Sequence, residues 1–244
     1  MEWTDEGVVL SVRAHGETAA IVEVFTRVHG RHLGLVHGGR GRTKRPILQP
    51  GNHVAAHWRA RLHDQLGTLT LELKHPYAAE LMDRRHGLLG LECLTTLARL
   101  LPERDPHPSL FEVTLFVLGF LGDDAIWPAL YARWELALLE ELGFGLDLSV
   151  CAVTGSNDYL AYVSPRTGRA VSMAAAEPFK DRLLALPEFL TGGGRSMASL
   201  RDVAAGLRLT GHFLSRDGLA PQARTMPDAR ERILLWLDTA TPDI

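Results

Sequence analysis

Residues 24–63 contain eight arginines and lysines, six histidines and no aspartate or glutamate. Cations of one sign repel each other, so a segment of this kind is typical of a surface that a polyanion neutralises. Guanidinium groups also donate paired hydrogen bonds to phosphate oxygens. The pattern therefore predicts a surface that binds a polyanion, with nucleic acid as the first candidate. Its candidate residues are Arg27, Arg31, Arg40, Arg42, Lys44, Arg45, Arg59 and Arg61.

The remainder of the chain has the opposite charge balance. Residues 76–244 carry 16 basic and 22 acidic side chains, and the whole chain of 244 residues has a net charge of −3. With 46% hydrophobic and 23% charged residues, the composition is that of an ordinary globular protein. We therefore expect a basic domain over residues 1–77 and an acidic domain over residues 78–244.

The first domain has the pattern of a small β-barrel. Turn-forming residues separate five segments of β-like sequence, at residues 8–13, 19–26, 31–37, 53–62 and 68–74. Alternation in the fourth segment places Trp58 inside and the basic residues outside. In the fifth segment it places Leu69, Leu71 and Leu73 inside. Five short strands predict the Greek-key barrel that binds oligonucleotides, the OB-fold.

A loop rich in glycine and arginine, residues 38–46, connects the third and fourth segments. We expect it to be mobile, with backbone N–H groups and arginines directed at phosphates. An ordinary solvated loop is the alternative. The spacing excludes a nucleotide-binding P-loop, because Gly41 is not followed by lysine and a hydroxyl residue at a helix start. Since only Phe25 and Trp58 are aromatic in the basic segment, we expect phosphate contacts to outweigh base stacking.

After residue 76 the apolar residues recur at helical spacing. Leucines from 81 to 101 predict a long helix, Ser109 and Glu112 have capping-box spacing at the start of a second, and Asp124 and Gly143 bound a third. Further helices are predicted at residues 178–186, 197–214 and 227–237, and residues 151–172 have the pattern of a small hairpin. The predicted fold class is α+β, with an N-terminal five-stranded OB-fold barrel followed by an α-helical domain.

Several motifs, taken in order, resemble the RecO family of bacterial recombination and repair mediators. They are EGVVL at 6–10, GET at 16–18, FTRVHG at 25–30, GGRGR at 38–42, LQP at 48–50, LGFGLDL at 142–148, CAVTG at 151–155 and YVSP at 162–165. The resemblance implies binding to single- and double-stranded DNA and annealing of complementary strands. It also implies that RecR and the single-stranded-DNA-binding protein are partners in loading RecA onto DNA, and RecF is a further candidate partner.

One part of the chain departs from the family. Many members carry two pairs of zinc-binding cysteines, and the matching positions here are Cys151, Thr154, Ser172 and Ala175. One thiol does not complete a tetrahedral zinc site, so we predict no zinc, a degenerate insertion over residues 151–175, and Cys151 as an inert remnant. We expect Tyr159, Tyr162 and Val163 to hold the insertion by packing.

Two other functions are alternatives. A sequence-specific DNA-binding regulator would use residues 197–214 as a recognition helix, but only Arg201 and Arg208 would reach bases there. A metal-dependent nuclease would need an acidic metal site, and the carboxylates of the helical domain have no recognisable metal-binding arrangement. Hydrolase and deaminase motifs are absent from the sequence, so we expect a binding protein without catalytic residues or cofactor.

The sequence also predicts a location and a partner site. Residues 1–6 lack the basic and apolar regions of an export signal, and no apolar stretch of about 18 residues follows. We therefore expect a cytoplasmic, nucleoid-associated protein without membrane contact. The resemblance implies that the helical domain binds the acidic, hydrophobic tail of the single-stranded-DNA-binding protein, with Arg133, Arg166, Arg169 and Arg195 as candidate contacts.

Overall fold

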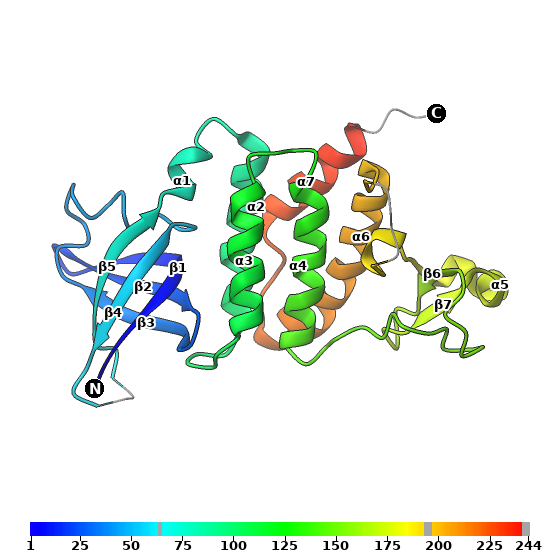
Figure 1. The fold of residues 1–244 in the computed structure, drawn as a ribbon, viewed down its shortest axis with the longest axis horizontal. Coiled ribbons are helices and arrows are strands. Elements are labelled where there is room, and N and C mark those ends of the chain that lie inside the picture. The colour runs from blue at the N-terminus through cyan, green and yellow to red at the C-terminus, as the bar shows by residue number, and fades with distance from the viewer. Residues whose placement is uncertain (63–64, 193–196, 241–244) are drawn as a thin grey trace. The chain divides into compact units, whose positions relative to one another are not determined.

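The first five strands close into a barrel, which confirms the predicted N-terminal architecture (Figure 1). The computed structural model describes residues 1–62, 65–192 and 197–240. Around the barrel the strands follow the order β1, β2, β3, β5, β4, and β4 pairs with β1 to close it. Their bounds are β1 Glu2–His15, β2 Ala19–Thr26, β3 Gly30–Val36, β4 His53–Arg59 and β5 Thr68–His75.

Strand β1 is long enough to pair with two neighbours. Residues 7–15 run antiparallel to β2, and residues 2–8 run antiparallel to β4. A register shift in the β1–β2 pairing marks a bulge at residues 9–11, and bulges bend strands. The predicted strand began at residue 8, but the six preceding residues join the barrel as well. They place Trp3 opposite Trp58.

Apolar side chains from the strands fill the barrel. Trp58 is fully buried, and its indole N–H donates a hydrogen bond of 2.9 Å to the Leu66 carbonyl oxygen. The predicted inward positions of Trp58, Leu69 and Leu71 are confirmed. The prediction is wrong for Leu73, which is 41% exposed. Leu73 lies next to a register shift in the β4–β5 pairing, where strict alternation is interrupted.

The chain divides into two compact units, Met1–Trp127 and Pro128–Ile244. The first unit contains the barrel together with α1 Tyr77–Glu80, α2 Arg85–Leu97, η1 Ala98–Leu100 and α3 Pro108–Phe120. Helix α4, Trp127–Glu141, begins at the boundary between the two units. The later helices of the second unit are α5 Met173–Ala176, η2 Glu177–Arg182, η3 Glu188–Leu190, α6 Leu200–Phe213, η4 Leu214–Leu219, η5 Ala220–Gln222 and α7 Asp228–Thr239. Among the helices that the structure describes, none has the length and apolar composition to cross a bilayer.

Two details of the helix prediction are wrong. Helix α3 has His107 as its N-cap and no side-chain cap bond, so Ser109 and Glu112 do not form a capping box. Instead of a helix at residues 178–186, the chain forms the 3₁₀ segment η2 and the short strand β8 Leu184–Ala185. The helices predicted at 197–214 and 227–237 are confirmed as α6 and α7 over the part that the structure describes.

The predicted hairpin is present as part of a three-stranded sheet. Strands β6 Leu160–Val163 and β7 Ala170–Ser172 are antiparallel, and β8 pairs with the other edge of β6. Tyr162 packs against a small core around Cys151, and Val163 is fully buried. Tyr159 does not contribute packing as predicted, because it is 85% exposed in a turn with φ of 48°.

A buried ion pair connects α4, α6 and α7 within the second unit. Glu135 of α4 is fully buried and accepts hydrogen bonds of 2.7 and 2.8 Å from the Arg230 guanidinium of α7. Thr210 of α6 donates its hydroxyl to the same carboxylate. Breaking a buried pair is costly because the remaining charge stays without solvent or a partner. This network therefore fixes how the three helices pack.

We expect Glu135→Ala to lower the free energy of unfolding of the second unit by about 3–5 kcal/mol, because Arg230 would be left buried without its carboxylate. The matched control is Asp238→Ala, which removes the exposed partner of Arg208 and should cost less than about 1 kcal/mol. Chemical denaturation of both variants measures the difference. Equal losses would contradict the role assigned to the buried pair.

Candidate nucleic-acid interface

One wall of the barrel is held against η1 by a buried carboxylate. Glu23 of β2 is only 2% exposed, and its oxygens accept hydrogen bonds from Ser11, Arg31 and Arg99. Burial acts to raise the pKa of Glu23, but the hydrogen bonds from these three residues outweigh burial and lower the pKa below its ordinary value. Glu23 is therefore ionised at neutral pH and holds two arginines in place.

Arg31 is fully engaged in this contact. Its Nε donates a hydrogen bond of 2.8 Å to the Leu101 carbonyl oxygen, and its guanidinium pairs with Glu23 and, at 3.7 Å, with Glu103. Only 16% of the side chain is exposed. Two carboxylates thus already compensate the charge of this predicted DNA-binding residue.

Arg27 also faces the helices of the first unit. Its Nη2 atom lies 2.7 Å from Glu112 of α3 and 3.7 Å from Glu6, and its guanidinium lies 5.6 Å from the centre of the Phe111 ring. The charge on Arg27 is therefore compensated within the first unit. Arg27 and Arg31 are thus both engaged by carboxylates of the first unit, and their contact with DNA stays a prediction.

The 38–46 loop keeps its positive charge uncompensated. Arg40 donates hydrogen bonds of 3.0 and 2.9 Å to the carbonyl oxygens of Gly16 and Glu17, and Lys44 donates one of 2.7 Å to the His37 carbonyl oxygen. Carbonyl oxygens orient these cations without cancelling their charge. Arg42 and Arg45 are exposed, and neither side chain has a bonding partner within the described ranges.

The backbone of this loop forms consecutive turns. The Gly39 and Gly41 N–H groups donate to the carbonyl oxygens of Val36 and Gly38, and the Lys44 and Arg45 N–H groups both donate to the Gly41 carbonyl oxygen. Because these N–H groups are occupied, the expectation that the loop backbone is directed at a phosphate is not met. The loop offers side-chain cations on a hydrogen-bonded turn, and its mobility stays a prediction.

Two buried residues that follow the 38–46 loop in the chain, Leu48 and Asn52, hold the loop on the barrel. Leu48 packs in the barrel core. Asn52 is buried, donates its side-chain amide to the Pro46 and Ile47 carbonyl oxygens, and accepts the Ala78 N–H. These contacts fix where the loop returns to β4.

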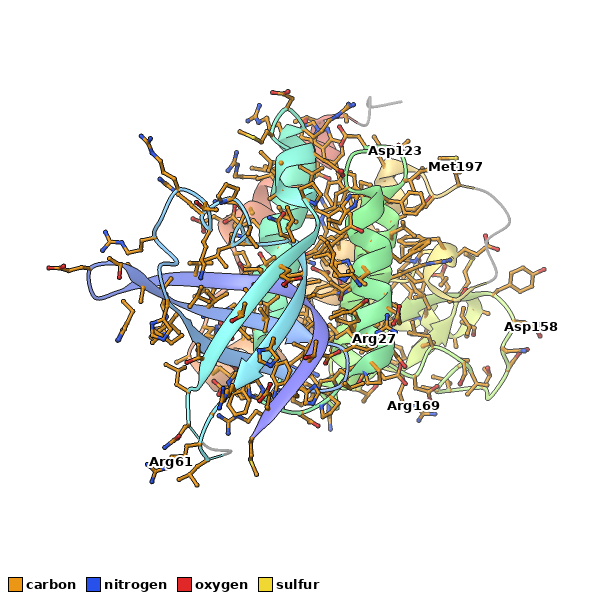
Figure 2. All side chains as sticks on the ribbon, turned by 60° about the vertical axis from the view of Figure 1, so that its left-hand side comes forward. Arg27, Arg61, Asp123, Asp158, Arg169 and Met197 are labelled. Atoms are coloured by element: carbon orange, nitrogen blue, oxygen red, sulfur yellow. The ribbon has the colours of Figure 1, made fainter. Side chains whose placement is uncertain are left out.

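Arg59 and Arg61 lie at a different end of the barrel. Arg59 is 76% exposed, and its Nε is 4.0 Å from Glu2. Arg61 is exposed and has no side-chain partner in the described part of the chain. Mutual hydrogen bonds between Met1 and Ala60 place the N-terminus beside this end, as Figure 1 shows. In Figure 2, Arg61 projects from this end, far from Arg27.

One histidine of the basic segment, His53, is partly withdrawn from water. Burial lowers the pKa of His53, and the Glu6 carboxylate near it offsets only part of this effect. His57 is bonded to Glu2 at 2.7 Å.

In the second unit, the predicted contacts for the tail of the single-stranded-DNA-binding protein are dispersed. Arg133 donates to the Phe189 carbonyl oxygen at 2.6 and 2.9 Å, Arg169 pairs with Asp147 at 3.4 Å, and Arg166 is exposed. Arg195 lies outside the described residues.

A groove of about 590 Å³ gathers other cations of this unit. Its lining includes Arg208, His212 and Arg216, beside the apolar side chains of Met226 and Leu234. The sequence prediction missed this groove, because its residues come from α6, η4, the segment that leads into α7, and α7 itself. Periodicity identifies the helices but does not show which of their outer faces meet.

The comparisons with known proteins cover both halves of the chain. Residues 1–77 match the family model described as "Recombination protein O N terminal", and residues 87–223 match "Recombination protein O C terminal". The chain belongs to the RecO family. This family serves DNA repair and recombination.

The RecO relatives match along almost their whole length. DNA repair protein RecO of Methylobacterium nodulans is 55% identical over 244 residues, which cover 98% of this chain and 99% of the relative. The protein of the same name from Rhodospirillum centenum is 54% identical over 237 residues, with 96% and 94% covered. That of Methylorubrum populi is 52% identical over 239 residues, with 96% and 97% covered.

At the insertion of this RecO chain, the one remaining cysteine is held by hydrogen bonds. The buried Cys151 Sγ accepts the Ser172 N–H at 3.3 Å. Burial acts to raise the pKa of the Cys151 thiol, but hydrogen bonds from Ser172 and Thr154 outweigh it and lower the pKa to about 6. With alanine at 175, the four positions do not fit a structural zinc site. Hydrogen bonds thus favour the thiolate form of a cysteine that is closed off from solvent, and its inertness stays a prediction.

We expect the ultraviolet absorbance of the Cys151 thiolate to titrate with a midpoint near pH 6, below the ordinary value of 9.0. The difference between the unsubstituted protein and Cys151→Ser isolates this signal, and Cys93→Ala is the control. Because folding lowers the pKa of Cys151, its thiolate stabilises the folded protein. This contribution to the free energy of unfolding is complete above pH 9.0 and is lost as the pH falls through about 6. A midpoint near the ordinary value would contradict the hydrogen-bonded thiolate.

Proposed function

We propose that this chain is a DNA-binding recombination mediator that anneals complementary strands and, with RecR, helps to load RecA onto DNA coated by the single-stranded-DNA-binding protein. The observation that carries the proposal is the charge on the 38–46 loop. Arg40, Arg42, Lys44 and Arg45 form no ion pair with a carboxylate within the described residues. A uniform cationic loop on an OB-fold barrel is suited to a phosphate backbone.

Both single and double strands satisfy this chemistry, since each presents phosphates. Each phosphate that the protein neutralises releases condensed counterions, so affinity falls steeply with salt. Neutralising the backbones of two strands also reduces their mutual repulsion, which allows complementary strands to approach and pair. Phosphate contacts carry no sequence information, and this suits a mediator that acts on any sequence.

We expect the double charge reversal Arg42→Glu and Arg45→Glu to weaken DNA binding at least about tenfold and to reduce the salt dependence by about two phosphate equivalents. Annealing of complementary oligonucleotides should slow in the same variant. The matched control is Arg201→Glu with Arg232→Glu, two exposed arginines of the second unit. Titration of labelled oligonucleotides at several salt concentrations measures the change. A flat salt response in the unsubstituted protein would contradict the proposal.

The same control tests the alternative of a sequence-specific regulator. Helix α6 would be the recognition helix, but Leu207 and Phe213 are buried on it, and Arg208 is paired with Asp238 at 2.6 and 2.7 Å. Most of this helix is therefore core. As for a nuclease, no group of three or more histidine, cysteine or acidic residues suited to a metal ion occurs among the described residues. The proposed function includes no catalytic step and no cofactor.

For protein partners, we propose that the groove between α6 and α7 receives the acidic, hydrophobic tail of the single-stranded-DNA-binding protein. Met226 and Leu234 offer apolar contacts at this groove. Arg208 and Arg216 line it as well, where Arg208 is paired with Asp238 and Arg216 with Asp217, so an acidic tail would compete with these carboxylates for the two arginines. RecR is the proposed partner in loading RecA, with RecF as a further candidate. In this proposal the protein acts in the nucleoid, where its DNA substrate lies, and does not contact the membrane.

We expect Arg216→Glu to weaken binding of a peptide with the sequence of that tail at least about tenfold, because like charges would then face each other in the groove. Arg232→Glu is the control, since Arg232 is exposed on α7 but does not line the groove. Fluorescence anisotropy of the labelled peptide gives both affinities. Unchanged affinity in Arg216→Glu would place the tail elsewhere.

A further inference from the structure

Three aromatic rings are stacked at the end of the barrel that carries the N-terminus. The ring centroids of Trp58 and Trp3 are 5.8 Å apart, and the two ring planes form an angle of 15°. The ring centroids of Trp3 and His29 are 4.3 Å apart, with an interplanar angle of 10°. Trp58 is buried in the core. The stack therefore leads from the inside of the barrel to its surface, and His29 is the outermost ring.

The orientation of His29 is fixed by its neighbours. One face of its ring is covered by Trp3, and its Nδ1 atom is bonded at 3.0 Å to Asp5, whose side chain is almost fully buried. Asp5 also accepts the Val28 N–H at 2.9 Å, which fixes the turn between β2 and β3. Even so, 32% of the His29 side chain is exposed, and Val28 next to it is 54% exposed.

Cations lie on the outer face of the strand that carries the innermost ring and just beyond the end of that strand. Strand β4 pairs Trp58 with Trp3 and Arg59 with Glu2, and because side chains alternate along a strand, Arg59 points outward where Trp58 points into the core. Arg61 projects from the same end of the barrel (Figure 2). The oriented, partly exposed ring of His29 is thus reached through Trp3 from the strand that carries the exposed Arg59 and leads to the exposed Arg61, and the 38–46 loop has no such ring.

We propose that this end of the barrel binds an unpaired nucleotide of single-stranded DNA, with its base stacked on His29 and its phosphates near Arg59 and Arg61. The proposal rests on the proposed function, since it assigns a base-binding position within the same DNA-binding domain. It also revises the expectation that the barrel has few stacking platforms, because Trp3 and His29 lie outside the pair of aromatic residues considered for the basic segment.

The proposed site distinguishes single strands from duplexes. Each base in a duplex is covered on both faces by its neighbours, whereas an unpaired base has a face available for an aromatic side chain. Stacking also differs from phosphate contact in its response to salt, because it releases no counterions. The barrel would therefore combine two contributions: a salt-dependent one from the loop for any DNA, and a salt-independent one at His29 for single strands.

The test compares His29→Ala and His29→Phe with the unsubstituted full-length chain. Probes are a labelled oligothymidylate and a labelled duplex of the same length. His29→Ala should weaken binding of the single strand roughly 5- to 150-fold, with the salt slope and the duplex affinity unchanged. His29→Phe loses the bond to Asp5 but keeps a flat aromatic ring. Because a base can stack on that ring, this variant should retain its affinity for the single strand. The control is His57→Ala, a histidine on the outer face of β4.

Equal loss for single strand and duplex, or no loss for either, would overturn the stacking site. Photocrosslinking of the unsubstituted protein to an oligonucleotide with 5-iodouracil gives a second readout that does not depend on how the variants fold. The crosslinked peptide should contain His29 or Trp3, and a crosslink confined to other segments would also overturn the site. If the unsubstituted protein shows no salt-dependent DNA binding at all, the proposed function itself fails.

Discussion

The buried carboxylate of Glu23 determines which positive charges of the barrel are available. It lies on β2, is bonded to Arg31 of β3 and Arg99 of η1, and is withdrawn from water. An uncompensated charge at this depth would be strongly destabilising. The two arginines are therefore required by the fold of the first unit, and only those cations that lie away from this contact keep their charge for a ligand.

The remaining cations differ in what holds them. The carbonyl oxygens that bind Arg40 and Lys44 orient these side chains but leave the loop positive. Arg61 lies at the end where Trp3 and His29 are stacked. The 38–46 loop thus offers charge alone. The end of the barrel that carries the N-terminus offers both charge and an aromatic ring. These two kinds of surface give the barrel a physical basis for holding DNA generally and single strands in particular.

Sequence alone predicted the barrel well because its strands have a period-two pattern that burial enforces, as Trp58 and Leu69 show. It failed for Arg31, since Glu23 and Arg99 are brought to it only by the folded chain. Local charge counting does not show such long-range compensation. The stacking of Trp3 on His29 was not predicted for a similar reason, because β1 extends to Glu2 and only the folded chain brings Trp3 against that ring. The exposed Tyr159 shows that an apolar residue type does not by itself indicate packing.

The most direct test of this account compares Arg31→Ala with Arg42→Ala in two measurements on each protein: the free energy of unfolding and the affinity for a single-stranded oligonucleotide. The account predicts that Arg31→Ala loses about 3 kcal/mol of stability or more and keeps DNA affinity under conditions where it remains folded. Arg42→Ala should keep its stability and lose affinity. The reverse result, with Arg31→Ala stable and defective in DNA binding, would contradict the division of the basic residues into structural and DNA-binding groups.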